Sequence, residues 1–282
     1  MTLEIVVSGI KISNPQKLVY KNPNVTKLEI VKYYEKIFDY IMPFLRNRLL
    51  SVVRCFGDLD NCFYKKHPQI NLEGERFLVT SDKGKDSEYF YIKTKTQFLY
   101  QVQLGTLEFH PWASTVKNLS SPNVMVFDLD PDESVSLKEV RRGVLEVKNV
   151  LDELGLVSFL KTSGGKGYHI VVPIKCSSFE KSEKFAKTIA LLLERKFPNR
   201  FISYASKEKR KGKIFIDWLR NKKGATSVAP FSLRAREGAT ISMPILWNDL
   251  ETAPKDVNIY NVDMFLAKNA WKNFFDVKQE IK

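Results

Sequence analysis

Cysteine and histidine are scarce in this 282-residue sequence, which contains three of each. No two cysteines form a C-x-x-C pair, and this argues against a four-ligand zinc site and a disulfide framework. We expect Cys55, Cys62 and Cys176 to be ordinary buried thiols. A metal site made of Cys55, Cys62 and His67 is the alternative, but its spacing matches no familiar zinc pattern.

Long apolar runs are also absent. No stretch reaches the roughly 18–20 residues that a membrane span needs. The first ten residues contain Glu4 and no basic residue, so they do not have the pattern of a secretory signal. The sequence therefore predicts a cytoplasmic protein without a membrane partner.

Positive charge is abundant. There are 45 Lys and Arg against 32 Asp and Glu, for a formal net charge of +13, and aromatic residues make up 12% of the chain. Such a surface fits a polyanion, and aromatic side chains can stack on bases. Nucleic acid is the natural candidate, although a lysine-rich soluble surface would have the same composition.

A pair of acids follows a run of strand-forming residues, Val124-Met125-Val126-Phe127. Because side chains in a strand alternate between faces, Asp128 and Asp130 lie on the same face. Two close carboxylates repel each other unless a cation lies between them, and hard divalent cations prefer oxygen ligands. We therefore interpret the pair as a metal site; a solvated strand end is the alternative.

A second candidate site lies at the start of a helix. Thr26-Lys27-Leu28-Glu29 is a capping box, and apolar residues continue at helical spacing to Leu45, with Pro43 in the last turn. Asn14, Lys17 and Lys27 gather at the helix N-terminus, where free N–H groups favour anions. This predicts a phosphate pocket, with solvated loop lysines as the alternative.

The first half of the chain shows a series of strand-like stretches. They are Leu49–Arg54, Phe63–Lys66, Arg76–Thr80, Glu88–Lys93 and Phe98–Leu104. The turn-rich residues 117–123 mark the boundary between the two halves. We expect an N-terminal α/β unit over residues 1–120 and a catalytic unit over residues 121–282, joined in one compact domain.

The second half alternates strands and helices. The pattern is strand 124–130, a helix from Ser136, strands 156–161 and 168–174, a helix from Ser177, and strand 213–218. This β-α-β-β-α-β order is that of ferredoxin-like and RNA-recognition-motif sheets, so the fold class is α+β.

Two further elements belong to this sheet. The glycine-rich loop 161–169 contains Ser163 and Lys166, which can bind a phosphate, although a plain hairpin turn is the alternative. Asp217 is an acid inside an apolar strand, where an uncompensated charge is costly. Three carboxylates beside a phosphate loop predict two-metal phosphoryl transfer. Arginines that can bind phosphate are Arg210, Arg220, Arg234 and Arg236.

These motifs occur in a familiar order. Asp128-Leu129-Asp130, Ser163-x-x-Lys166-x-x-His169 and Phe215-Ile216-Asp217-Trp218 resemble the three motifs of the archaeo-eukaryotic primase superfamily. The chain resembles the polymerase domain of bacterial ligase D and the stand-alone prokaryotic end-joining polymerase-primases, from residue 11 to about residue 250. The resemblance implies a primase-polymerase fold, in which an RNA-recognition-motif-like catalytic sheet packs against the N-terminal unit.

The resemblance also implies roles for individual residues. Asp128, Asp130 and Asp217 match catalytic ligands of two Mn²⁺ (or Mg²⁺) ions. The positions that match nucleotide-binding residues are His110, Ser163, Lys166, His169 and Arg234. We also expect Arg220 to bind the nucleotide, although ligase D relatives often carry a polar amide at this position. Asn14, Lys17 and Lys27 match a pocket for a DNA 5′ phosphate, whereas Phe63, Tyr64 and Arg210 match template and primer contacts.

The implied activity is a template-directed polymerase of non-homologous end joining, which fills gaps at double-strand breaks with NTPs in preference to dNTPs. The implied partners are gapped or broken DNA with a 5′ phosphate, a Ku-like protein and a separate DNA ligase, since no K-x-D-G motif occurs. An end-bridging dimer on nucleoid DNA is a further implication. A replicative-type primase, a non-catalytic nucleic-acid-binding module and a phosphatase or sugar-nucleotide transferase built on Asp128 and Asp130 are the alternatives.

Overall fold

The computed structural model of the protein describes residues 5–70, 73–80, 84–206 and 208–281. The chain forms two compact units, and the mixed α+β class is confirmed. The first unit contains Met1–Trp112 and Val228–Ile241, and the second contains Ala113–Ser227 and Ser242–Lys282. The units differ from the expected halves, 1–120 and 121–282, chiefly because residues 228–241 return to the first unit.

Hydrogen bonds show why residues 228–241 belong to the first unit. The hydroxyl of Tyr33 donates to the carbonyl of Phe231 at 2.6 Å, and the Ser232 hydroxyl accepts from the amide of Phe109 at 3.0 Å. The hydroxyl of Tyr34 accepts from the amide of Leu233 at 3.0 Å. These partners are buried, so the returning segment completes the core of this unit.

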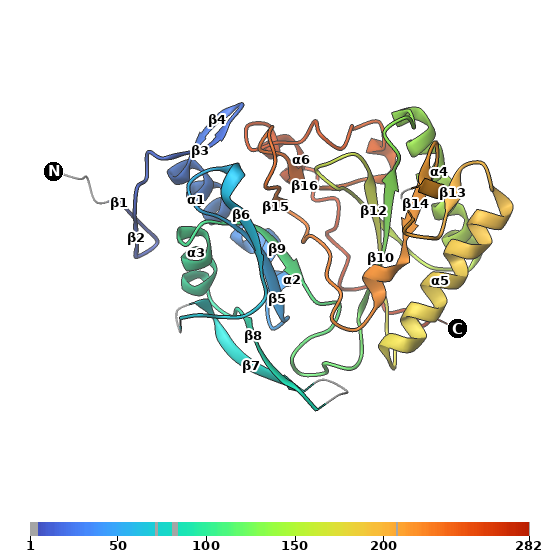
Figure 1. The fold of residues 1–282 in the computed structure, drawn as a ribbon, viewed down its shortest axis with the longest axis horizontal. Helices are drawn as coiled ribbons and strands as arrows, with labels where there is room; N and C mark the ends of the chain where they lie inside the picture. Colours follow the sequence, from blue (N-terminus) through green and yellow to red (C-terminus); the bar gives the residue numbers. More distant parts are fainter. Residues whose placement is uncertain (1–4, 71–72, 81–83, 207, 282) are drawn as a thin grey trace. The chain divides into compact units, whose positions relative to one another are not determined.

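The first unit is built on an antiparallel sheet (Figure 1) with the strand order β6-β5-β8-β7, and β9 pairs with β5 as well. Its elements are β1 (Ile5–Val7), β2 (Ile10–Ile12), β3 (Leu18–Lys21), β4 (Asn24–Thr26), α1 (Lys27–Lys36), α2 (Phe38–Leu45), β5 (Leu50–Cys55), β6 (Cys62–Lys65), β7 (Glu75–Thr80), β8 (Asp86–Tyr91), α3 (Lys95–Gln103), β9 (Thr106–Pro111) and β15 (Ser232–Leu233).

One helix prediction and one strand prediction need correction. The continuous helix expected after Thr26 is two helices that meet at Ile37, with Pro43 inside the second. The strand predicted over Phe98–Leu104 is wrong, because this segment belongs to helix α3. Thr94 and Gln97 form a capping box at its start, and this local signal outweighs the strand preference of the apolar residues.

The expectation of three buried thiols is wrong for Cys55 and Cys62, which form a disulfide. The two residues are direct partners across the β5–β6 ladder, with Cα atoms 4.0 Å apart. The cross-strand register brings the sulfur atoms together, and a count of cysteines does not contain this information. Cys176 is a buried free thiol, as predicted.

A buried charged cluster connects three elements of the first unit. The Glu73 carboxylate accepts from Arg54 at 2.9 Å and from Lys65 at 2.7 Å. Arg54 also donates to the side-chain oxygen of Gln101 at 3.0 Å. Because buried charges are stable only when they are paired and hydrogen-bonded, this cluster fixes β5, β6 and α3 to one another.

The second unit contains the predicted alternation of strands and helices. Its elements are β10 (Val124–Pro131), α4 (Leu137–Glu153), β11 (Phe159–Thr162), β12 (Tyr168–Pro173), α5 (Phe179–Lys196), β13 (Phe201–Ile202), β14 (Ile214–Asp217), β17 (Pro244–Ile245) and α6 (Val262–Leu266), while β16 (Ile241–Ser242) spans the unit boundary. Apart from β16, which pairs with β15, the strands form one sheet in the order β13-β14-β10-β12-β11-β17. Figure 1 labels β13, β14, β10 and β12 of this sheet.

One face of this sheet is apolar and packs against helices. Gly143 of α4 approaches Ile214 and Phe201 so closely that an added Cβ would clash with both side chains. Ile214 and Ile216 alternate with Phe215 and Asp217 along β14, so the acid points away from this helix. The opposite face of the sheet is therefore the one that presents acidic residues. No helix in the described ranges is both long and apolar enough to cross a membrane.

Candidate active site

A row of charged residues crosses four strands of the second unit's sheet. In the central strand β10, Asp128 is the direct partner of Asp217 on β14 and of His169 on β12. His169 is in turn the partner of Lys161 on β11. Residues in direct register have Cβ atoms about 5 Å apart, so the four side chains are consecutive neighbours.

Asp128 lies between a histidine on one side and an arginine on the other. His169 Nε2 lies 3.3 Å from one carboxylate oxygen, and Arg220 Nε lies 3.4 Å from the other. Burial alone would raise the pKa of Asp128, but His169, and then Arg220 and Lys161, hold it well below its usual value.

Asp217 has the opposite electrostatic balance. Burial raises its pKa, the Arg220 guanidinium 3.0 Å away opposes this, and the negative charges of Asp128 and Asp130 add to the rise. One oxygen of Asp217 also accepts from the amide of Leu219 at 3.1 Å, which caps a short 3-10 helix, η4 (Trp218–Asn221). The backbone that follows the strand thus fixes the carboxylate.

Asp130 lies one step further along β10, on the same face, and its side chain is 51% exposed. Arg210 donates to it at 2.7 Å, and the Arg210 guanidinium lies 4.4 Å from the ring centre of Phe215. Phe215 is the cross-strand partner of Asp130. The ring therefore orients the arginine toward the acid through a cation–π contact.

The three carboxylates suit a hard divalent cation by their chemistry, since all donors are oxygens on one sheet face. Among the described residues, no group of three His, Cys, Asp or Glu side chains stands ready to hold an ion. The guanidinium groups of Arg210 and Arg220 face the acids, and His169 contacts Asp128. These positive charges mark the acidic face as a place where cations are stabilised.

The loop between β11 and β12 is a tight turn organised by Ser163. The Ser163 hydroxyl accepts from the amides of Gly165 at 3.0 Å and Gly167 at 3.2 Å. Lys166 forms an exposed ion pair with Glu133 at 2.6 Å. A Cβ on Gly167 would clash with the carbonyl of Leu129, so glycine permits the close approach to β10. The backbone of this loop is thus a hairpin turn, which was the alternative to a phosphate-binding loop. The Lys166 side chain is still exposed enough to contact an anion.

Lys161 is a site residue that sequence reasoning missed. It is fully buried, and its ammonium donates to the Ser242 hydroxyl at 2.5 Å. Its register opposite His169 places a positive charge at the end of the acidic row. The only signal in the sequence was a lysine at an inward-facing strand position, where a charge needs a partner.

His110 and Arg234 belong to the first unit, whereas Ser163, Lys166, His169 and Arg220 belong to the second. The first two residues are joined by Glu108, which sequence reasoning also missed. Glu108 contacts His110 Nε2 at 2.8 Å and Arg234 Nε at 3.1 Å. Burial alone would raise the pKa of Glu108, but His110, Arg234 and the amide of Ala235 lower it to about 2.

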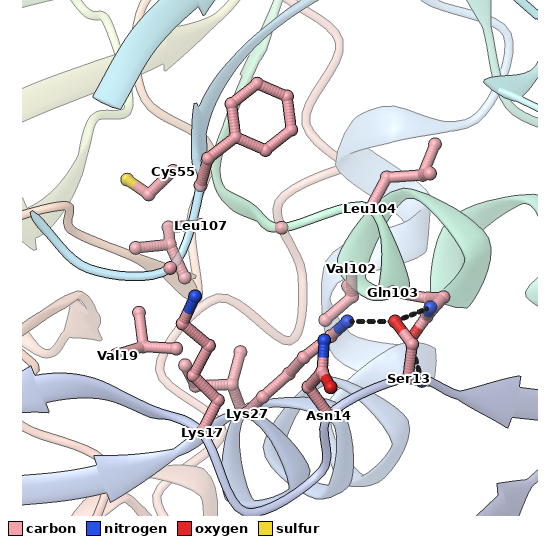
Figure 2. Close-up of a pocket in the computed structure, with 14 residues that line it drawn as sticks. Ser13, Asn14, Lys17, Val19, Lys27, Cys55, Val102, Gln103, Leu104 and Leu107 are labelled. Atoms are coloured by element: carbon pink, nitrogen blue, oxygen red, sulfur yellow. Dashed lines mark hydrogen bonds between the residues drawn. The ribbon is translucent and has the colours of Figure 1, made fainter. Parts of the chain in front are cut away.

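The predicted phosphate residues line one pocket of about 340 Å³ in the first unit. Figure 2 shows the Lys17 ammonium pointing toward Cys55 and Leu107, while the Lys27 ammonium lies at Ser13. In the described part of the chain, no carboxylate forms an ion pair with either lysine. Two unneutralised ammonium groups beside the Asn14 side chain suit a dianionic group such as a terminal phosphate.

A hydrogen-bonded chain positions Lys27. Gln103 of α3 donates to the Ser13 hydroxyl at 2.7 Å and accepts from the Ser13 amide at 3.1 Å, and the Lys27 ammonium donates to the same hydroxyl at 3.1 Å (Figure 2). Burial, and then the charge of Lys17, lower the pKa of Lys27 to about 8. The Lys27 ammonium therefore loses its proton at a lower pH than an ordinary lysine does.

The two aromatic residues predicted to stack on the template lie on edge strand β6. As consecutive strand residues, Phe63 and Tyr64 point to opposite faces. Phe63 packs on Phe56 with ring centres 5.3 Å apart, whereas Tyr64 lies 5.6 Å from the ring of His110. The pair is therefore divided between the face near the phosphate pocket and the face that contains His110.

Acidic residues on one face of a mixed sheet, with exposed basic side chains nearby, suit phosphoryl transfer, which is the chemistry of a nucleotidyltransferase of the polymerase class. The chain belongs to the LigD primase-polymerase domain family, whose profile matches residues 26–272. Catalysis in this family is metal-dependent. The expected resemblance to the ligase D polymerase domain is thereby confirmed.

Similar proteins are much longer than this chain. The chain is 33% identical over 290 residues to the multifunctional non-homologous end joining protein LigD of Pseudomonas aeruginosa, covering 97% of the chain and 34% of that protein. It is 29% identical to LigD of Mycolicibacterium smegmatis, and this match covers 86% of the chain and 32% of that protein. The chain thus spans about a third of these relatives.

Among solved structures, the polymerase domain of Mycobacterium tuberculosis ligase D in complex with DNA matches with a TM-score of 0.85. The two sequences are 26% identical, and the match covers 93% of this chain and 95% of that one. The similarity extends over nearly the whole of both chains, so both units described above belong to the shared fold.

Proposed function

We propose that this chain is the gap-filling polymerase of prokaryotic non-homologous end joining, a template-directed enzyme that prefers ribonucleotides. The observation that carries the proposal is the register of Asp128 opposite Asp217, which concentrates carboxylates on one sheet face. The strand order β14-β10-β12-β11 supports an RNA-recognition-motif-like catalytic sheet, because that motif has the same order. The name of the relatives, non-homologous end joining protein, supports the pathway.

We propose that Asp128, Asp130 and Asp217 hold two Mn²⁺ or Mg²⁺ ions. When bound, such ions stabilise the developing charge on the attacking and leaving oxygens. His169, and then Arg220 and Lys161, lower the pKa of Asp128, so this carboxylate is available to a cation in its ionised form. Asp217, whose pKa is raised, is the carboxylate suited to orient and deprotonate the 3′ hydroxyl of the primer.

In the second unit, residues on and beside the acidic face of the sheet are proposed to bind the incoming NTP or dNTP. Lys166 and Arg220 offer exposed positive charge to its triphosphate, and Ser163 and His169 shape the loop and sheet beside it. In the first unit, Glu108 orients His110 and Arg234, which match nucleotide-binding positions of the family. A bidentate guanidinium contact is well matched to phosphate oxygens.

The DNA substrate is proposed to carry a 5′ phosphate next to the gap. Lys17, Lys27 and Asn14 bind that phosphate, and Phe63 and Tyr64 stack on the template strand. Arg210 contacts the primer when it leaves Asp130. DNA in the related Mycobacterium tuberculosis structure supports a DNA substrate.

The partners follow from the pathway. A Ku-like protein would recruit the enzyme to broken ends on nucleoid DNA in the cytoplasm, and two copies would bridge two ends. Ligation would come from a DNA ligase module outside these 282 residues, because they contain no K-x-D-G motif.

Single-nucleotide insertion into a one-nucleotide gap tests the proposal. The assay compares 5′-phosphate with 5′-hydroxyl downstream strands, UTP with dTTP, and the wild type with Lys17→Ala. Lys32→Ala, an exposed lysine on helix α1, is the matched control. We expect insertion that prefers UTP and the 5′ phosphate, with the phosphate preference lost only in Lys17→Ala.

Other outcomes separate the alternatives. Insertion that ignores the 5′ phosphate would point to a priming enzyme. DNA binding that weakens with salt, with no insertion under any divalent metal, would show a non-catalytic binding module.

A further inference from the structure

We propose that Phe56 is a base-stacking residue of the phosphate pocket. Its ring would take the base of the nucleotide whose 5′ phosphate binds between Lys17 and Lys27. The proposal rests on the proposed function and adds a contact to the same site. It differs from template stacking, because it concerns the phosphorylated strand.

The exposure of Phe56 is the first observation. The residue lines the pocket together with Lys17 and Asn14, yet it is 64% exposed. Single exposed apolar residues are common on protein surfaces. This one lies beside two ammonium groups that suit a phosphate, and in a nucleotide only the sugar separates the phosphate from the base.

The second observation is the aromatic partner. Phe63, which is 39% exposed, supports Phe56 with a ring-centre distance of 5.3 Å and an angle of 33° between the planes. Tyr64 points to the other face of the strand. The two phenylalanines therefore form a separate aromatic surface on the hairpin that carries the pocket wall.

The loop that holds Phe56 is fixed before any ligand binds. The Cys55–Cys62 disulfide closes it, and the Phe56 amide donates to the carbonyl of Asn61 at 3.0 Å. Asp58 accepts from the side chain of Asn61 at 2.9 Å. Preorganisation of this kind lowers the entropic cost of binding.

Gly57 lies between the Phe56 ring and the Lys17 ammonium that would bind the phosphate. The Lys17 side chain lies directly over Gly57, at the position that a Cβ would occupy. The cation and the ring are thus adjacent along the pocket wall. A phosphate at Lys17 brings its own nucleotide next to Phe56, and stacking of a base on an aromatic ring contributes about 1–3 kcal/mol.

The test uses a duplex whose 5′-terminal base is 2-aminopurine, with either a 5′ phosphate or a 5′ hydroxyl. Fluorescence quenching reports stacking, and titration gives the dissociation constant. The variants are Phe56→Leu, Phe56→Trp and Phe275→Leu. Phe275 is the matched control, because it is 39% exposed and packs on another ring, that of Phe274. Thermal unfolding verifies that each variant is folded.

We expect wild type to quench the phosphorylated end, and Phe56→Leu to lose the quenching and bind roughly 5- to 150-fold more weakly. Phe56→Trp should keep the quenching, because it keeps an aromatic ring. Phe275→Leu should show the quenching and the affinity of the wild type. Phe56→Leu should keep its preference for the phosphate, because both lysines remain. Unchanged quenching and affinity in Phe56→Leu would overturn the proposal.

The two proposals fail differently. Quenching that needs Phe56 but is the same for hydroxyl and phosphate ends would overturn the assignment of the ring to a phosphate pocket. A wild type that neither prefers phosphate nor inserts a nucleotide would refute the proposed function itself, whatever the behaviour of Phe56.

Discussion

Asp128 and Asp217 face each other directly across the β10–β14 ladder, and one guanidinium, that of Arg220, contacts both carboxylates. Like charges in direct register destabilise a sheet unless a cation compensates them. Arg220 supplies this compensating charge, so the two carboxylates depend on one guanidinium.

We predict that Asp217→Asn lowers nucleotide insertion by about 100-fold or more. A metal ion contributes several kcal/mol to such a transition state, and about 1.4 kcal/mol is a factor of ten in rate. The amide has the same shape, so the fold should be kept. The measurement is single-turnover insertion, with Asp152→Asn, an exposed acid on α4, as the control. Equal rates in both variants would disprove the role of Asp217.

We predict that the preference for a 5′ phosphate declines as the pH rises above about 8. Burial and Lys17 lower the pKa of Lys27 to about 8, so the free protein loses this charge well before an ordinary lysine would. Lys27→Arg stays charged and should keep its preference to higher pH, although the guanidinium geometry differs. The ratio of dissociation constants for phosphate and hydroxyl ends, measured from pH 7 to pH 10, checks this. Parallel curves for the two proteins would contradict it.

Glu108→Gln should lower the free energy of unfolding by about 3–5 kcal/mol at neutral pH, because it leaves Arg234 without its buried carboxylate. The folded-state pKa of Glu108, about 2, lies below the unfolded value, so its stabilisation is present above about pH 4.5 and is lost as the pH falls toward 2. The gap in stability between wild type and variant should shrink over this range.

Urea unfolding at several pH values measures that gap. Glu88→Gln is the control, because Glu88 pairs with Arg76 at an exposed site. Such pairs contribute about 0–1 kcal/mol. A pH-independent gap for Glu108→Gln would show that the carboxylate charge is not what stabilises the unit.

Gly57→Ala should weaken the phosphate preference without abolishing insertion. A Cβ at this position would displace the Lys17 ammonium. Gly57 also has φ of +98°, so part of any effect is backbone strain. Gly9→Ala is the matched control, because Gly9 has φ of +80° and open space around its Cβ position. The comparison is insertion on phosphate and hydroxyl gaps, and equal preference in both variants would exclude the steric explanation.

The sequence predicted the parts of the protein that depend on local patterns. Alternation placed Asp128 and Asp130 on one face, and the capping box located the start of α1 at Thr26. Asp217 was recognisable as an acid inside an apolar strand, and it also matches a family motif. These features are determined by a few neighbouring residues, so a single sequence contains them.

Features that depend on contacts between residues far apart in the sequence could not be predicted from local patterns. The Cys55–Cys62 bond requires the register of β5 and β6, and Glu108 acquires its role from Arg234, which is 126 residues away by number. The cluster of Arg54, Lys65 and Glu73 also forms across separate elements. Tertiary contacts decide such cases.

The return of residues 228–241 to the first unit has a consequence for work with fragments. A polypeptide that stops at residue 120 would lack the carbonyl that Tyr33 bonds and the hydroxyl that Phe109 bonds. Such a truncation would leave buried polar groups unsatisfied and would not be a self-sufficient folding unit. A minimal version of the first unit needs both stretches, joined by a linker or supplied as a complementing peptide.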